Sequence, residues 1–238
     1  MLGQQSIILL APAQHRQRRR LLTPPFHGER LKAFGSLITS LATEAMADLQ
    51  PGDVFDARTR MQRITMRVIL TAVFGLHEGE AMRRLERTLH EGLGIRSSRL
   101  GSLLLFFPFL RKDLGPWSPG GRIRAAEASI RRQLLAQIVA CRAAVKRAGE
   151  HDGSADILSL LLACTDEQGQ GLSDDELHDE LLTLLFAGHE TTATALTWAF
   201  HWLHRTPAVR DRLLEELQTL PEPAIPMRSP GFPISRQW

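Results

Sequence analysis

One segment of the sequence places a histidine, an acid and two hydroxyl groups at helical spacing. It reads Ala187-Gly188-His189-Glu190-Thr191-Thr192 and lies between two apolar stretches. Glycine costs about 1 kcal/mol in a helix interior relative to alanine, and a threonine hydroxyl can bond the carbonyl four residues back. Thr191 is four residues after Ala187, so its hydroxyl is predicted to compete for that carbonyl. The segment is therefore a predicted weak point within a helix.

The same residues admit other interpretations, namely a metal site or a purely structural helix. His189 and Glu190 would open the HExxH zinc signature, but the position four residues after His189 is Ala193, which excludes that site. His201 and His204 are three residues apart, a spacing more typical of packing or of a surface than of a metal site. A buried helix with a glycine kink remains the alternative for the six residues alone.

A basic segment near the start of the chain is the second candidate. His15 and Arg19 are four residues apart and share one face of a predicted helix, where they can present two donors to a carboxylate or phosphate. Arginines also occupy positions 16, 18 and 20. The arginine that binds the anion is therefore uncertain by one position, and Arg18 or Arg20 could take the place of Arg19. The alternative is a solvated or nucleic-acid-facing basic helix.

Most of the remaining sequence predicts helices that hold these two segments. Ser173-Asp174-Asp175-Glu176 has the capping-box pattern and begins a helix predicted to reach Arg205, where Thr206 as cap and Pro207 start another. Apolar spacing predicts further helices at 13–22, 29–49, 57–76, 79–93, 122–147 and 156–164, with an apolar loop at 101–121. The fold class is mainly α with no strand. Residues 1–220 form one domain, and proline-rich residues 221–238 form a disordered tail.

Composition sets limits on the function classes. The 238 residues carry a formal net charge of +3 and 43% hydrophobic residues, which fits a globular protein and gives no charge argument for nucleic acid. Two cysteines without CxxC spacing predict neither a disulfide framework nor a zinc knuckle. No apolar run approaches the about 20 residues of a membrane span. The chain is predicted to be cytoplasmic.

Both candidate segments resemble the cytochrome P450 monooxygenases. The family's oxygen-binding motif is a small residue, glycine, any residue, an acid, threonine, then threonine or serine, which residues 187–192 match. The resemblance implies that Thr191 hydrogen-bonds bound dioxygen and that Glu190 belongs to the proton-delivery route. Ala187 and Gly188 would leave room for oxygen and substrate. His15 and Arg19 match the positions that contact the haem propionates, with Gly3 and Ser6 in the loop just ahead.

The resemblance also implies a cofactor, partners and a fold. The cofactor is haem b, electrons come from a ferredoxin or flavoprotein, and the substrate is an apolar small molecule. There is no nucleic-acid partner and no membrane span. The expected architecture is a truncated cytochrome P450 fold, with a long central helix surrounded by others.

Two family segments are missing from the 238 residues. The ExxR motif is absent after the long helix, and Glu80-Ala81-Met82-Arg83, which has its letters, lies upstream. The haem loop requires a glycine four residues before its cysteine, whereas Cys141 and Cys164 have Gln137 and Leu160 there, and both cysteines are predicted to pack on helices. We therefore expect an internal fragment from a truncated or frame-shifted gene, without thiolate-ligated haem and with little turnover. The alternative is a non-enzymatic helical binding protein.

Overall fold

A computed structural model describes residues 3–26, 29–50, 52–76, 79–97, 115, 117–148, 156–166 and 168–219. The chain divides into two compact units. Unit 1 contains Met1–Phe26 and Leu70–Leu184, and unit 2 contains His27–Ile69 and Leu185–Trp238. The tail at 221–238 and most of the loop predicted at 101–121 lie outside the described residues. The mainly α fold class is confirmed, since the only β pairing in the described part is an isolated bridge between Thr165 and Gly171.

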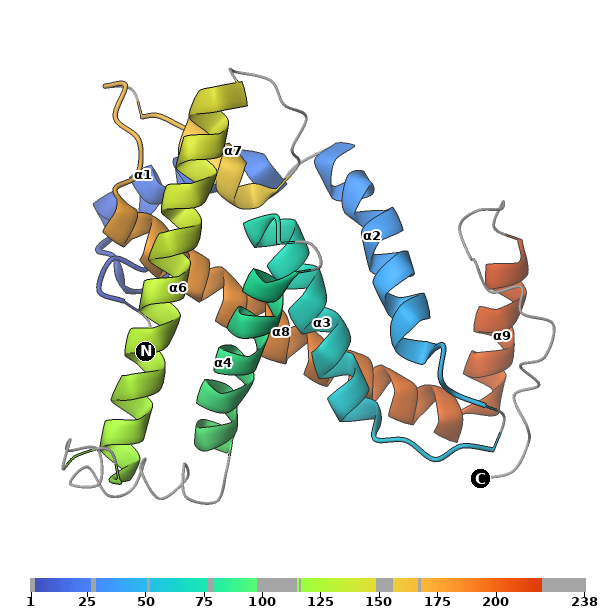
Figure 1. The fold of residues 1–238 in the computed structure, drawn as a ribbon. Coiled ribbons are helices and arrows are strands. Elements are labelled where there is room, and N and C mark those ends of the chain that lie inside the picture. Colours follow the sequence, from blue (N-terminus) through green and yellow to red (C-terminus); the bar gives the residue numbers. More distant parts are fainter. Residues whose placement is uncertain are drawn as a thin grey trace. The chain divides into compact units, whose positions relative to one another are not determined.

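Unit 1 is built around leucine-rich helices. Its elements are η1 (Ile7–Leu9), α1 (Pro12–Leu22), η2 (Pro24–Phe26), α4 (Glu80–Ser97), α6 (Pro119–Ala148) and α7 (Ile157–Ala163), with the end of α3 and the beginning of α8. Helix α4 packs along α6, and α6 packs on α7 (Figure 1). The fully buried side chains include Leu70, Phe74, Leu89, Leu134, Ile138, Leu158, Leu161, Leu177 and Leu181.

Unit 2 contains α2 (Glu29–Met46), α3 (Ala57–Phe74) as far as Ile69, α8 (Asp174–Arg205) from Leu185 onward, and α9 (Pro207–Gln218). Its core is smaller than that of unit 1. Three helices contribute to it, through the buried residues Ala45, Met61, Ile64 and Ala193, with Ala42, Met46, Val68, Leu196 and Phe200 packed around them. The small side chain of Ala193 on α8 thus faces the two other helices.

The start of α8 follows its sequence signal. The Ser173 hydroxyl accepts from the Glu176 amide at 3.3 Å, and the Glu176 carboxylate accepts from the Ser173 amide at 2.9 Å. This reciprocal pair is the predicted capping box. Helix α3 ends at Phe74, two residues before the end of the helix predicted at 57–76, and Gly75 follows it with a φ of +62° that a glycine adopts without strain.

The cap predicted for α9 is wrong in one respect. Pro207 is at the first helical position, but the Thr206 side chain makes no capping hydrogen bond. The reason is that the Val209 amide donates to the Thr206 backbone carbonyl instead, at 3.0 Å. Two backbone groups therefore satisfy each other, and the hydroxyl is not needed.

No helix in the described part of the chain is both long and apolar enough to span a bilayer.

Candidate functional site

The segment 187–192 is continuous helix within α8 of unit 2. The Thr191 hydroxyl donates to the Ala187 carbonyl, as its spacing predicted. Both residues are exposed, whereas Ala193 on the opposite face is buried in the core of unit 2. While this hydroxyl donates to Ala187 it can only accept a further hydrogen bond, because it carries a single proton. A rotation about χ1 would free that proton for another acceptor.

Gly188 packs against α3 of the same unit. A Cβ atom at Gly188 would lie 2.2 Å from Cδ1 of Ile69 and 3.5 Å from its Cγ1. The first distance is far below van der Waals contact, so the hydrogen side chain of glycine lets the two helices approach. Within unit 2, the space that a larger residue at 188 would fill is taken by Ile69.

Glu190 is held by two side chains of α3. Its carboxylate forms an ion pair with Arg58 and accepts from Nε2 of Gln62 at 3.0 Å. Both partners of the ion pair are substantially exposed. The preceding residue, His189, is buried, and its Nδ1 lies 3.0 Å from the Thr65 hydroxyl. Three consecutive positions of α8 are thus fixed by one face of α3.

The basic helix α1 of unit 1 presents its arginines in different ways. His15 is half-buried and Arg19 is exposed, and neither side chain has a hydrogen bond or ion pair with another described residue. Arg20 is exposed and does have a partner. Arg18 is 7% exposed and is turned toward α8. Of the four arginines that left the register open, Arg18 is therefore committed within the fold, and the pair His15 and Arg19 shares the accessible face.

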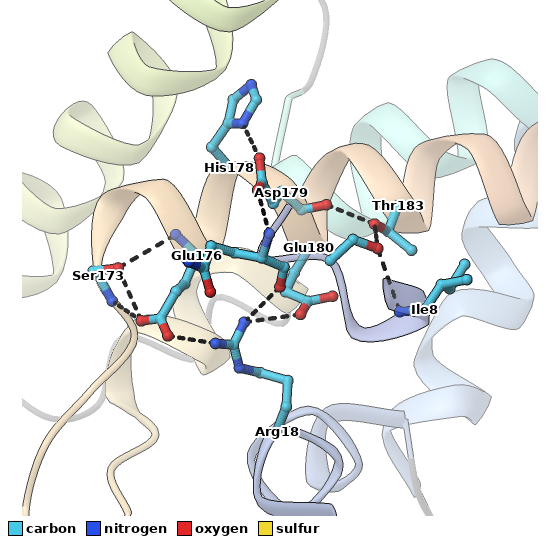
Figure 2. Close-up of polar contacts among 10 residues, drawn as sticks. Ile8, Arg18, Ser173, Glu176, His178, Asp179, Glu180 and Thr183 are labelled. Carbon is cyan, nitrogen blue, oxygen red and sulfur yellow. Dashed lines mark hydrogen bonds and ion pairs between the residues drawn. The ribbon is translucent and has the colours of Figure 1, made fainter. Parts of the chain in front are cut away.

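Arg18 binds two carboxylates and a carbonyl (Figure 2). Its Nη1 donates to Oε1 of Glu180 at 2.9 Å and to the Gln5 carbonyl at 3.2 Å, while its Nη2 donates to Glu176. Glu180 is 1% exposed and its second carboxylate oxygen has no partner among the described residues. Burial raises the pKa of Glu180, and the Ile7 backbone amide and the Arg18 guanidinium oppose this effect only in part. No local sequence pattern brings Arg18, Glu176 and Glu180 together.

The loop ahead of α1 closes on the same part of α8. A Cβ atom at Gly3 would lie 1.8 Å from the Asp179 carboxylate, so a larger residue there would require that side chain to move. The Gln5 amide donates to Asp179 at 2.9 Å, and the Thr183 hydroxyl lies 2.7 Å from that of Ser6. Gly3 and Ser6, which the sequence placed just ahead of the basic helix, therefore attach the chain to α8.

Cys141 lies on a helix, as predicted, whereas Cys164 follows the last residue of α7 in an extended conformation, so its predicted place on a helix is wrong. The Cys141 sulfur on α6 lies 3.1 Å from the Ser159 hydroxyl on α7, and burial raises the pKa of the Cys141 thiol. Cys164 follows α7, where its amide donates to the Leu160 carbonyl at 3.1 Å. A thiol with a raised pKa is a poor source of the thiolate that binds metals.

Unit 1 also contains a cavity of about 230 Å³ beside Arg18. Its lining is predominantly polar: Gln5, Gln14, Gln17, Arg18, Asp166, Gln170 and Glu176, with Gly171 and the apolar Leu10, Leu21 and Leu172. Such a lining does not match the apolar small molecule that the resemblance implied. No three acidic, histidine or cysteine side chains in the described part of the chain are grouped so that they could hold a metal ion.

Comparisons with known proteins agree on one family. The family model described as cytochrome P450 matches residues 2–227, a match that ends within the predicted tail. Putative cytochrome P450 138 of Mycobacterium tuberculosis is 37% identical over 91% of the chain and 47% of its own length. Putative cytochrome P450 137 of the same species is 35% identical over 87% of the chain and 42% of its length. The chain spans about half the length of the curated relatives it matches.

Solved structures give the same fold. A retinoic acid-bound cyanobacterial CYP120A1 aligns with a TM-score of 0.71 and 25% identity, over 92% of this chain and 46% of that one. The haem domain of cytochrome P450DA aligns with a TM-score of 0.66 and 22% identity, over 94% and 46%.

Proposed function

Because the chain belongs to the cytochrome P450 family, we propose that it supplies the oxygen-side helix and a cofactor-contacting helix of a haem monooxygenase. The family's haem cofactor, when bound, supplies the oxidising chemistry that inserts one oxygen atom into a substrate. The observation that carries the proposal is the accessible face of α8, where the small Ala187 lies beside the exposed hydroxyl of Thr191. Both residues match the family's oxygen motif.

In this proposal each residue has a separate task. Thr191 would offer its hydroxyl to dioxygen once rotated away from the Ala187 carbonyl, and Glu190 would relay protons from the solvent, to which its carboxylate is partly open. Gly188 brings α8 close to α3, which leaves Ala187 as the small residue on the accessible face. His15 and Arg19 would donate hydrogen bonds to the haem carboxylates from α1, where their side chains have no hydrogen bond or ion pair with another described residue.

The residues present do not fit the axial ligand of the family's haem. Neither cysteine has the glycine of the haem loop, and Cys141 is a protonated thiol packed between helices. We infer that these 238 residues alone hold no thiolate-ligated haem and turn over little or no substrate. An apolar small-molecule substrate, a ferredoxin or flavoprotein as electron donor, and a cytoplasmic location belong to the same proposal.

Two measurements test this proposal. In the first, the purified chain is mixed with haem, reduced and exposed to CO. We expect no Soret band at the position of a thiolate-ligated haem, and such a band would contradict the inference. In the second, haem is titrated into the wild type, His15→Ala and Arg19→Ala. We expect both substitutions to weaken binding, by about tenfold each for the loss of one charge-assisted contact. Equal affinities of the three proteins for haem would contradict the proposal that His15 and Arg19 of α1 contact the haem carboxylates.

A further inference from the structure

Helix α1 has few means of attachment to the rest of unit 1. Its only buried residues are Arg18 and Leu22, and Ala11 at its N-terminus provides no side-chain cap. A single leucine restricts neither the rotation of a helix about its axis nor its register along a neighbour. Beyond the loop that attaches the chain ahead of α1 to α8, the orientation of α1 therefore depends largely on what Arg18 contacts.

The contacts of Arg18 are suited to fixing that orientation. Glu176 and Glu180 are four residues apart and so lie one above the other on one face of α8, and each binds a different terminal nitrogen of the guanidinium. A planar guanidinium that binds two carboxylates in this way permits only a narrow range of positions. A third contact, to the Gln5 carbonyl at 3.2 Å, adds the loop ahead of α1.

Arg18 and Arg19 are consecutive, so their side chains are about 100° apart around the helix axis. Holding Arg18 against α8 therefore determines where Arg19 projects, together with His15 on its face. Without the two carboxylates, another exposed arginine such as Arg16 or Arg19 could turn toward α8, and the accessible face would vary.

We propose that Arg18 is a positioning residue for the cofactor: by binding Glu176 and Glu180 it turns the face of His15 and Arg19 toward the porphyrin carboxylates. This inference rests on the proposed function, in which that face contacts haem. It assigns Arg18 no contact with the cofactor. The sequence alone left Arg18 as a possible contact itself.

The experiment compares two probes that differ only in their carboxylates, zinc protoporphyrin IX and its dimethyl ester, in fluorescence titrations of the full chain. The ratio of the two dissociation constants measures how well the protein recognises the carboxylates. We expect the wild type to prefer the diacid and Arg19→Gln to lose about tenfold of that preference. The key variant is Arg18→Met/Glu180→Met, which replaces the buried pair by apolar side chains so that the protein still folds.

We expect this double variant to lose a similar part of the preference while its helical circular dichroism is unchanged. Arg18→Lys, which keeps the charge, should recover part of the preference. Arg16→Gln is the control, because it removes one exposed positive charge from the same helix and should leave the ratio within about twofold. A purely structural role for Arg18 would weaken binding of both probes equally and leave the ratio unchanged.

Different results would overturn the positioning role of Arg18 and the proposed contacts of α1. A folded double variant with the wild-type ratio would overturn the role of Arg18 while leaving Arg19 as a contact. A wild type that does not distinguish the probes, or an Arg19→Gln variant with the wild-type ratio, would overturn the proposed contacts of α1 and the positioning role with them.

Discussion

Two glutamates ten residues apart on α8 are in contrasting surroundings, although each is paired with an arginine. Glu180 in unit 1 is 1% exposed, and its partner Arg18 is nearly as buried. Glu190 in unit 2 has a side chain that is 44% exposed, and that of its partner Arg58 is 52% exposed. A buried pair cannot lose one member without leaving a charge out of water, whereas an exposed pair exchanges its partner for solvent. Breaking the buried pair is therefore expected to lower the free energy of unfolding more than breaking the exposed pair.

The largest effect is expected for Arg18→Met. The substitution leaves Glu180 buried without its cation, and breaking a buried pair in this way costs about 3–5 kcal/mol. The free energy of unfolding from urea denaturation should fall by that amount. Arg18→Met/Glu180→Met should recover most of the loss, because neither charge is left alone. A single variant as stable as the wild type would show that water reaches this pair.

Gly188→Ala should have the next largest effect. Its Cβ would lie 2.2 Å from Cδ1 of Ile69, and overpacking of this kind costs about 1–3 kcal/mol, partly offset by the better helix propensity of alanine. Ile69→Val removes that atom, so the double variant should be more stable than the sum of the two single changes predicts. Strict additivity in the double-mutant cycle would mean that the helices do not approach closely here.

A third effect is confined to a range of pH. Burial raises the pKa of Glu180 above the ordinary glutamate value of 4.5. Between the lower pKa in the unfolded chain and the higher one in the folded protein, the folded state binds more protons, so this group makes stability fall as pH rises. Urea denaturation of wild type and Glu180→Gln between about pH 4 and pH 7 isolates this contribution, because the other groups titrate in both proteins.

The free energy of unfolding of the wild type, relative to that of Glu180→Gln, should therefore fall as pH rises. A relative free energy that rises instead would mean that attraction to Arg18 outweighs burial.

The smallest effect is expected for Arg58→Met, the counterpart of Arg18→Met in the exposed pair. Exposed ion pairs contribute about 0–1 kcal/mol, and Gln62 still donates to Glu190 in the variant. The urea midpoint should shift little, and the shift should diminish further in high salt. A loss as large as that of Arg18→Met would remove the distinction between the two pairs.

Features fixed by neighbours in the sequence were predictable. The capping box at Ser173 and Glu176 and the bond from Thr191 to Ala187 each involve residues no more than four positions apart. The family motifs likewise identified the fold class. In such cases, local geometry determines the outcome before any tertiary packing is considered.

Features that depend on distant residues were not predictable. Glu180 is 162 positions from Arg18, and Glu190 is 132 positions from Arg58. Nothing in the basic run distinguishes Arg18 from the arginines next to it until α1 lies on α8. Gly188 was assigned to making room for oxygen, and its contact with Ile69 could be seen only once α3 was placed beside it.

The Glu176 carboxylate makes two contacts at once. One of its oxygens accepts from Ser173 to close the first turn of α8, and the other accepts from Arg18 of α1. The first turn of α8 and the packing of α1 on α8 thus depend on the same carboxylate. These two parts of unit 1 should therefore open together as one cooperative unit. In native-state hydrogen exchange, amides of α1 and of the first turns of α8 should converge on a common opening free energy. Ser173→Ala, a change made on α8, should then accelerate exchange in α1, which Ser173 does not contact.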